Sequence, residues 1–300
     1  MSSVLNRRDL FRGVAVAGVT AAGGSVLAPS AHAKSHEHRK RPFGLGLVTY
    51  YVAHDWDLDT LIKNCNEVDI RPVEFRTTHK HGIEPTLSKS ERKDVRKKCE
   101  DGGIIIWGVG TACDFHSPDP AVVEKNIEET KRFIDLAHDI GAKGVKVRPN
   151  GLPPEVPVEK TLEQIGTSLR TVGEAAGSAG VEIWCEVHGR DSSHPPHMRK
   201  MMDIADHPAV GVTWNSNGSD LKDGSIDEYF KLLRPKIYAV HMNELVNDYP
   251  YRRLFELLTE TGFDRYTMIE AQPMKSANVP DNVRFLKYYK ALWEELSRPG

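Results

Sequence analysis

From Phe43 onward, the chain alternates eight times between a short run rich in β-branched and aromatic residues and a longer stretch with helical spacing. The predicted strands are 44–50, 71–76, 103–110, 144–148, 181–190, 210–215, 236–242 and 266–271. The predicted helices are 57–68, 88–101, 120–140, 158–179, 197–205, 226–233, 251–260 and 281–296. Alternating strands and helices form a parallel sheet covered by helices, and eight such units in about 260 residues match a single-domain α/β protein, a (β/α)8 TIM barrel.

Local signals agree with these elements. Asp55 or Asp57 is placed to cap the first helix, Ser88 with Glu91 fits a capping box at the second, and Gly141 ends the third. The main structural rival is a doubly wound open sheet, which seldom needs eight such units. Its dinucleotide-binding members open the first helix with a GxGxxG motif, which is absent here.

The fifth predicted strand, Val181–Arg190, carries ionisable side chains toward its C-terminal end. Alternate residues of a strand share a face, so Glu182, Trp184, Glu186 and His188 lie on one side. The opposite side is apolar and suited to packing under helices. Because a parallel barrel places its active site at the C-terminal ends of its strands, Glu186 and His188 are candidate site residues.

The overall composition is that of an ordinary globular protein. The chain has 300 residues, 39% hydrophobic and 27% charged, with a formal net charge of −2. The chain lacks the excess of basic residues that would indicate nucleic acid as a partner. The four cysteines lack CxxC spacing, which argues against a zinc ribbon or a disulfide scaffold. Whether Cys65 and Cys99 pair stays open.

Residues 1–33 are predicted to be a signal peptide rather than part of the fold. An arginine pair within Asn6–Arg12 precedes a mildly apolar run, and Ala31-His32-Ala33 offers small residues for a signal peptidase. This pattern resembles a twin-arginine export signal, with the basic residues 34–42 as a flexible lead-in and the barrel at 43–300. It implies export by the twin-arginine machinery, a periplasmic or extracytoplasmic location and no stable membrane anchor.

Four consecutive predicted strands end in a potential metal ligand. On the inward face near their C-terminal ends, strand five carries Glu186, strand six Asn215, strand seven His241 and strand eight Glu270. In a barrel these ends meet at one mouth. Two carboxylates, one imidazole and one amide oxygen suit a single divalent ion such as Mn²⁺, Mg²⁺ or Zn²⁺.

These residues give residues 43 to about 297 a resemblance to the xylose isomerase-like sugar isomerases and epimerases, which include the tagatose and psicose 3-epimerases. The resemblance implies that Glu186 and Glu270 are both metal ligands and the acid/base pair. Asn215 departs from the family pattern, an aspartate followed three residues later by a histidine, since Gly218 stands at that later position. An amide brings no charge, so weaker metal binding, or loss of the metal, is expected.

Other polar residues near the expected mouth are candidates for substrate binding. Each lies near the C-terminal end of a predicted strand or in the loop that follows it, where side chains face the active site. The candidates are Glu74, His79, His81, His116, Arg148, His188 and Arg190. The alternatives are solvated loop histidines and salt bridges within the barrel.

The sequence thus predicts an exported enzyme that abstracts a proton beside a carbonyl group of a sugar or sugar derivative. Isomerisation or epimerisation is the first hypothesis. A lyase or hydratase acting on keto-sugars or 3-keto-glycosides is the second, because an enolate can also expel a neighbouring leaving group. A non-catalytic sugar-binding barrel is a third. An endonuclease IV-like function would require a richer metal cluster and a basic groove. A homo-oligomer is possible, and a small-molecule sugar is the expected partner.

Overall fold

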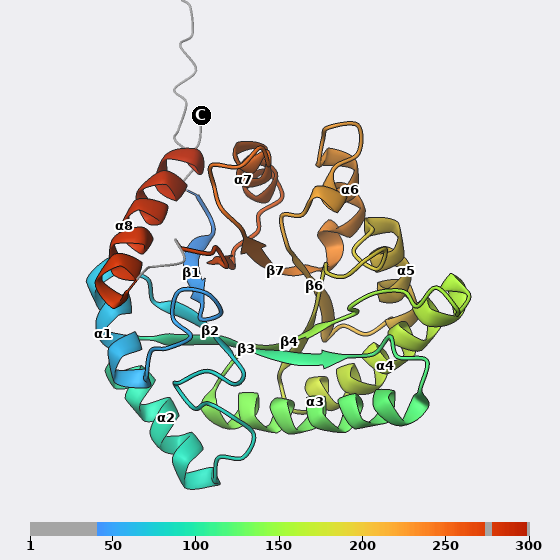
Figure 1. The fold of residues 1–300 in the computed structure, drawn as a ribbon, viewed down its shortest axis with the longest axis horizontal. Coiled ribbons are helices and arrows are strands. Elements are labelled where there is room, and N and C mark those ends of the chain that lie inside the picture. Colours follow the sequence, from blue (N-terminus) through green and yellow to red (C-terminus); the bar gives the residue numbers. More distant parts are fainter. Residues whose placement is uncertain (1–40, 274–277, 299–300) are drawn as a thin grey trace, which may run out of the picture. The chain divides into compact units, whose positions relative to one another are not determined.

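The eight β-rich runs pair side by side in chain order, and the first strand closes on the last. The computed structural model describes residues 41–273 and 278–298, and all neighbouring strands are parallel (Figure 1). The strands are β1 (Gly44–Val48), β2 (Pro72–Arg76), β3 (Ile105–Asp114), β4 (Gly144–Arg148), β5 (Glu182–Glu186), β6 (Val210–Trp214), β7 (Ile237–Met242) and β8 (Tyr266–Ile269). The predicted (β/α)8 barrel is confirmed. The predicted signal peptide, and the lead-in up to residue 40, lie outside the described residues.

Helices follow the strands and surround the barrel (Figure 1). They are α1 (Leu58–Val68), α2 (Lys89–Asp101), α3 (Pro120–Ile140), α4 (Val158–Ser178), α5 (Pro195–Ala205), α6 (Asp227–Leu233), α7 (Tyr251–Glu260) and α8 (Val279–Leu296), with short 3₁₀ turns η1 (Gly218–Asp220) and η2 (Arg234–Lys236). None of the helices in the described part of the chain combines the length and apolar character needed to cross a membrane.

The predicted helix ends are formed by capping side chains at two helix starts and by a left-handed glycine at one helix end. Asp57, rather than Asp55, caps α1 by accepting a hydrogen bond from the backbone N–H of Thr60. Ser88 and Glu91 form the full capping box of α2. Gly141 ends α3 with a left-handed φ of 80°.

Two tryptophan rings fill part of the barrel interior. Trp107 and Trp184 stack with ring centroids 5.2 Å apart. A Cβ at Gly144 or Gly108 would approach the Trp184 ring to 2.3 or 2.5 Å, so both glycines make room for it. Core packing, and not stacking on a ligand, is therefore the role of these tryptophans. The four cysteines are free and buried.

Two strand ends differ from the prediction in a way that shapes the mouth. β5 stops at Glu186 rather than Arg190, the chain bends from Val187 onward, and Gly189 takes φ 91° in this turn. β3 continues beyond Gly110 to Asp114, which pairs with Arg148 at the end of β4. The β3, β4 and β5 loops consequently begin close to one another.

Candidate active site

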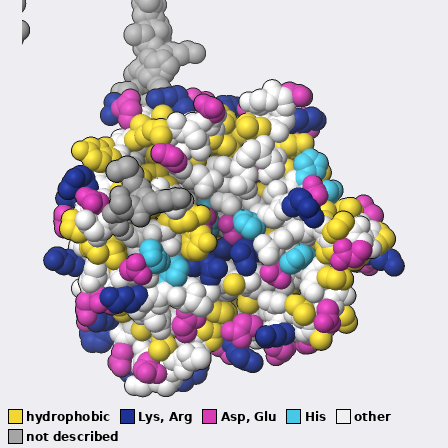
Figure 2. Space-filling view, viewed as in Figure 1, with side chains coloured by type: hydrophobic (Ala, Val, Ile, Leu, Met, Phe, Trp, Pro, Cys, Tyr) yellow, Lys and Arg dark blue, Asp and Glu magenta, His cyan; other side chains and the backbone are white. Residues whose placement is uncertain are grey.

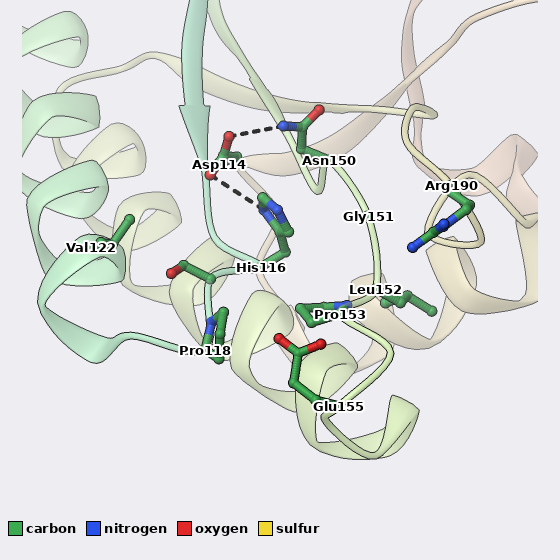
Figure 3. A pocket seen from close by; sticks show the side chains of 11 residues that line it. Asp114, His116, Pro118, Val122, Asn150, Gly151, Leu152, Pro153, Glu155 and Arg190 are labelled. Atoms are coloured by element: carbon green, nitrogen blue, oxygen red, sulfur yellow. Dashed lines mark hydrogen bonds and ion pairs between the residues drawn. The ribbon is translucent and has the colours of Figure 1, made fainter.

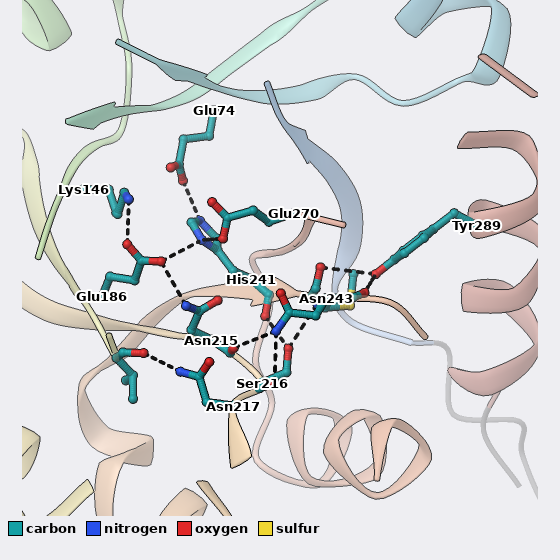
Figure 4. A network of polar contacts seen from close by, with 12 residues as sticks. Glu74, Lys146, Glu186, Asn215, Ser216, Asn217, His241, Asn243, Glu270 and Tyr289 are labelled. Atoms are coloured by element: carbon teal, nitrogen blue, oxygen red, sulfur yellow. Dashed lines mark hydrogen bonds and ion pairs between the residues drawn. The ribbon is translucent and has the colours of Figure 1, made fainter. Parts of the chain in front are cut away.

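Three of the predicted metal ligands converge at the C-terminal mouth of the barrel. Glu186, His241 and Glu270 each place one ligand atom so that all three atoms lie within 4.8 Å of one another. They come from β5, β7 and the residue after β8, and they point toward a common centre (Figure 4). Parallel strands in a barrel end at one level, so residues distant in sequence meet there.

His241 is held between two carboxylates. Its Nε2 lies 3.0 Å from Glu74 Oε2, and its Nδ1 lies 3.0 Å from Glu270 Oε2 (Figure 4). The imidazole is fully buried. Burial alone would lower its pKa, but Glu74 and Glu270 outweigh burial and raise the pKa of His241 to about 10. The side chain is therefore fixed in orientation from both ends.

Glu186 is a buried carboxylate with two protein partners. Lys146 Nζ lies 2.6 Å from its Oε2, and Asn215 donates a hydrogen bond from Nδ2 to its Oε1 at 2.9 Å. Burial favours the neutral acid, but the charges of Lys146 and His241 prevail and lower the pKa of Glu186 to about 2. Glu186 is an ionised carboxylate at neutral pH.

Lys146 was not identified from the sequence, although a signal for it exists. It lies in the middle of the β-rich run Gly144–Arg148 and shares a face with Arg148, a candidate residue. Its side chain is 3% exposed and Glu186 is 4% exposed, so the pair is almost entirely withdrawn from water. A lysine inside an otherwise apolar strand indicates such a buried partner. Arg76, two residues after Glu74, was missed in the same way.

A cavity of about 260 Å³ opens above these residues. Its walls combine the predicted residues with several that sequence reasoning missed. It is lined by Tyr50, Tyr51, Arg76, Lys146, Arg148, Glu186, His188, Asn215, Asn217, Asn243 and Glu270. We call it the catalytic cavity. Figure 2 shows basic, acidic and histidine side chains gathered near the centre of this face of the molecule.

The remaining predicted substrate-binding residues divide into three groups. His188 and Arg148 line the catalytic cavity. His116 and Arg190 line a neighbouring cavity. His79 is partly buried and bonded to Thr49.

Glu74 and His81, also predicted to bind substrate, are engaged by other groups of the protein and line neither the catalytic cavity nor the one that His116 lines. Glu74 is fully buried and bonded to His241. Both ring nitrogens of His81 are engaged by backbone groups, the carbonyl of Arg76 and the N–H of Ile83. Burial lowers the pKa of His81 to about 4, so the ring is neutral at pH 7. Both residues hold neighbouring groups at the barrel mouth in place: Glu74 holds His241, and His81 holds the backbone after β2.

The donor set fits a divalent metal ion. Asn215 Oδ1 is buried without a hydrogen-bond partner among the described residues, which leaves an amide oxygen available as a ligand. A metal-binding histidine usually donates its other ring N–H to a carboxylate, and Glu74 stands at that position behind His241. Glu186, His241 and Glu270, with Asn215, are the residues that would hold the ion.

A further buried acid, Asp220, lies next to this site and supports it. Asp220 in η1 accepts hydrogen bonds from the backbone N–H of Asn217 and from the Tyr249 hydroxyl, and Asn217 in turn donates to the carbonyl of Val187. Burial raises the pKa of Asp220 to about 7. The protonated acid is therefore favoured in the folded state between its ordinary pKa and about 7.

Stability is expected to fall with pH through this group. Below its unfolded pKa of 3.8 the protonated Asp220 contributes fully, and the contribution is lost as pH rises to about 7. Between pH 5 and pH 8 the free energy of unfolding should drop by about 2–3 kcal/mol more in the native protein than in Asp220→Asn. Denaturant unfolding at four pH values measures this, and parallel curves for the two proteins would contradict it.

The fold and the site together define a class of protein. It is a (β/α)8 barrel whose C-terminal mouth carries carboxylate and imidazole groups of the kind that bind metal ions. Residues 62–289 match the family described as xylose isomerase-like TIM barrel, and the chain belongs to that family.

Proteins that this chain resembles in part of its sequence or in its fold include a dehydratase and epimerases. The chain is 31% identical over 126 residues to a 3-dehydroshikimate dehydratase of Pseudomonas putida, a match covering 41% of this chain and only 19% of that protein. A D-psicose 3-epimerase from Clostridium cellulolyticum matches in structure with a TM-score of 0.74 at 14% identity, over 85% of this chain and 100% of that one. The Escherichia coli 3-keto-D-glucoside 4-epimerase matches with a TM-score of 0.66 at 14% identity, over 82% and 99%.

Proposed function

We propose that this protein is a sugar isomerase or epimerase that moves a proton on a carbon next to a carbonyl group. The observation that carries the proposal is the convergence of Glu186, His241 and Glu270 within 4.8 Å at the barrel mouth. Two comparisons support the proposal: the chain belongs to the xylose isomerase-like family, and epimerases are among the solved structures with the same fold. A bound divalent metal ion would stabilise negative charge on the carbonyl oxygen as the proton leaves.

Glu270 is our candidate for the group that accepts the proton. Its side chain is 11% exposed and lines the catalytic cavity, and its described side-chain partner is His241. Glu186 also lines the cavity, but Lys146 and Asn215 hold it as a fixed carboxylate. Epimerisation requires a proton to be delivered to the opposite face of the carbon. Glu186 is ionised, so in this proposal it first takes a proton from the ammonium of Lys146, 2.6 Å away, and passes it to the carbon, while Glu270 keeps the proton it removed.

A lyase or dehydratase reaction is the second candidate function. The partial match to a dehydratase favours it. The ammonium group of Lys146 faces the same cavity, where it could stabilise a leaving hydroxide. Incubation of a 3-keto-glucoside in deuterated water separates the two. Deuterium in a recovered epimer supports epimerisation, whereas a product lighter by one water supports the dehydratase.

Asn215→Asp tests whether the residues at the mouth hold a metal ion. Adding a carboxylate in place of the amide should tighten binding of Mn²⁺ at least about 10-fold, because a charged oxygen is the better ligand for a hard cation. Elemental analysis and Mn²⁺ titration measure this. Asn247→Asp, at an exposed position after β7 that does not line the catalytic cavity, is the control. Equal Mn²⁺ affinity in native protein and Asn215→Asp would remove residue 215 from the ligand set. Metal bound solely by the variant would favour a sugar-binding barrel without metal chemistry.

We also propose that the protein is exported by the twin-arginine route. The support is the sequence pattern of residues 1–33, with Arg7-Arg8 before the apolar run. In cells, the mature protein is expected in the extracytoplasmic fraction, and replacing both arginines with lysine should keep it inside. Mass spectrometry of the exported form should give an N-terminus at Lys34. Retention of the intact native chain in the cytoplasm would contradict the proposal.

A further inference from the structure

A second and larger cavity lies beside the catalytic cavity. Its volume is about 550 Å³, against about 260 Å³ for the catalytic cavity. Its walls come from the loops after β3, β4 and β5 and from the start of α3 (Figure 3). The lining residues are Asp114, His116, Ser117, Pro118, Val122, Asn150, Gly151, Leu152, Pro153, Glu155 and Arg190. We call it the outer cavity.

One wall of the outer cavity is a connected set of hydrogen-bonding groups. Asp114 accepts a hydrogen bond from Asn150 Nδ2 at 3.1 Å, and its other oxygen lies 3.3 Å from His116 Nδ1 (Figure 3). Gln164 of α4 donates to the carbonyls of Phe115 and Ser117 and so holds the β3 loop. The polar wall is therefore built before any ligand arrives, which lowers the ordering cost of binding.

The two cavities share the ends of the same two strands. Arg148 and His188 line the catalytic cavity, and two residues further along, Asn150 and Arg190 line the outer one. Cα atoms two residues apart are separated by at most about 7 Å. One wall therefore serves both cavities.

That shared wall is fixed by close backbone packing. A Cβ at Gly189 would lie 2.5 Å from the Asn150 carbonyl carbon and 2.6 Å from the Gly151 nitrogen, so the β4 and β5 loops meet backbone to backbone. Asn150, Gly151 and Gly189 all have positive φ, a backbone conformation that glycine and asparagine adopt more readily than other residues, so the sequence suits this close approach.

The lining of the outer cavity suits an uncharged polyhydroxylated group. Carboxylate, amide, imidazole and guanidinium groups supply donors and acceptors, while Pro118, Leu152 and Pro153 supply an apolar floor for C–H faces. Asp114 and Glu155 oppose the positive charge of Arg190, so a phosphate or carboxylate would meet repulsion. The catalytic cavity lies below the ~300–1,000 Å³ typical of ligand sites, so a larger substrate would extend out of it.

We propose that the outer cavity is a second sugar subsite, and that the substrate is a disaccharide or glycoside whose reacting ring occupies the catalytic cavity. This inference rests on the proposed function for the nature of the reacting ring. The second ring lies against Asn150, His116 and Arg190, beside the apolar floor. With one ring in each cavity, the preferred substrate is a sugar of two rings and not a free monosaccharide.

Binding of unreactive sugars tests the subsite without relying on turnover. Calorimetric titration of the full mature chain should compare glucose and glucose 6-phosphate with cellobiose, maltose and lactose. At least one disaccharide is expected to bind at least 10-fold more tightly than glucose. Glucose binding as tightly as every disaccharide, glucose 6-phosphate binding most tightly, or no sugar binding at all would each overturn the proposal.

Val122→Trp tests the position of the second ring. Val122 is 39% exposed at the start of α3 and lines the outer cavity, so an indole there should fill space without disturbing the core. The expected result is that the affinity ratio of disaccharide to glucose falls at least 10-fold. Val158→Trp is the matched control, because Val158 is 41% exposed at the start of α4 and lines neither cavity. Native-like ratios are expected for this control.

The same two variants separate this proposal from the proposed reaction. Deuterium exchange from solvent into the 3-keto forms of glucose and of the preferred disaccharide reports the chemistry. If neither 3-keto sugar exchanges but Val122→Trp still abolishes the disaccharide preference, the reaction is wrong and the subsite stands. If exchange occurs and the preference is unchanged in Val122→Trp, the subsite is wrong and the reaction stands.

Discussion

Replacement of Glu270 with glutamine is expected to lower the rate of proton exchange by about 10³-fold or more while the barrel stays folded. Glutamine has nearly the same size, so the cavity keeps its shape, but it cannot accept a proton and carries no charge beside His241. A positioned general base contributes roughly 10²–10⁴ in rate, and a weakened metal site would add to the loss. Solvent deuterium exchange into a keto-sugar measures the rate, and thermal unfolding monitors the fold.

Glu244→Gln is the control for the Glu270 experiment. Glu244 is exposed, lies shortly after the neighbouring strand β7 and lines neither cavity. The Glu244→Gln variant should exchange deuterium into the keto-sugar at the native rate. Native exchange in Glu270→Gln would remove Glu270 from the catalytic role, and a loss of equal size in both variants would point to a general effect on the barrel.

Replacement of Lys146 with methionine is expected to destabilise the protein by about 3–5 kcal/mol. Methionine fills the space of the lysine stem, but Glu186 then stays buried with its charge no longer matched by an ammonium 2.6 Å away. Removing one partner of a buried ion pair is the costly case, because among its described partners Glu186 would keep only the hydrogen bond from Asn215 and the more distant His241, 4.0 Å away. Urea unfolding at neutral pH measures the change in the free energy of unfolding.

Two further variants determine whether charge is the cause. Lys143→Met removes a lysine from the same β-region, but its side chain is 48% exposed and its pair with Glu182 should be worth at most about 1 kcal/mol. The double variant Lys146→Met with Glu186→Gln should recover much of the lost stability, because it removes the unpaired charge. If the double variant is as unstable as Lys146→Met alone, lost packing and not charge explains the effect.

Much of the fold could be predicted from the sequence because its signals are local. The period of apolar residues distinguishes strand from helix, and caps such as Ser88 with Glu91 or the terminal Gly141 mark helix ends within one turn. Eight such units leave few alternatives to a closed barrel. The predicted bounds of α3, β4 and α7 agree with the structure at both ends.

The candidate site could be predicted in part for the same reason. Once the strands are known, their C-terminal residues share one mouth, which is how Glu186, His241 and Glu270 were identified. Lys146 and Arg76 could have been found by extending the alternation rule one residue pair along β4 and β2. These residues were missed because a charged residue in a strand does not reveal which residue of another strand will be its partner.

The partners of each side chain were decided by tertiary structure alone. Glu74 and His241 are 167 positions apart, and no pattern indicates that one carboxylate lies behind the imidazole. The outer cavity arises because Gly189 packs on the backbone of the β4 loop, an approach set by loop conformation. Sequence periodicity is a property of single elements and determines which face a residue takes. Contacts between elements depend on how the closed barrel and its loops bring distant residues together, and this arrangement decides which side chains support the site and which line it.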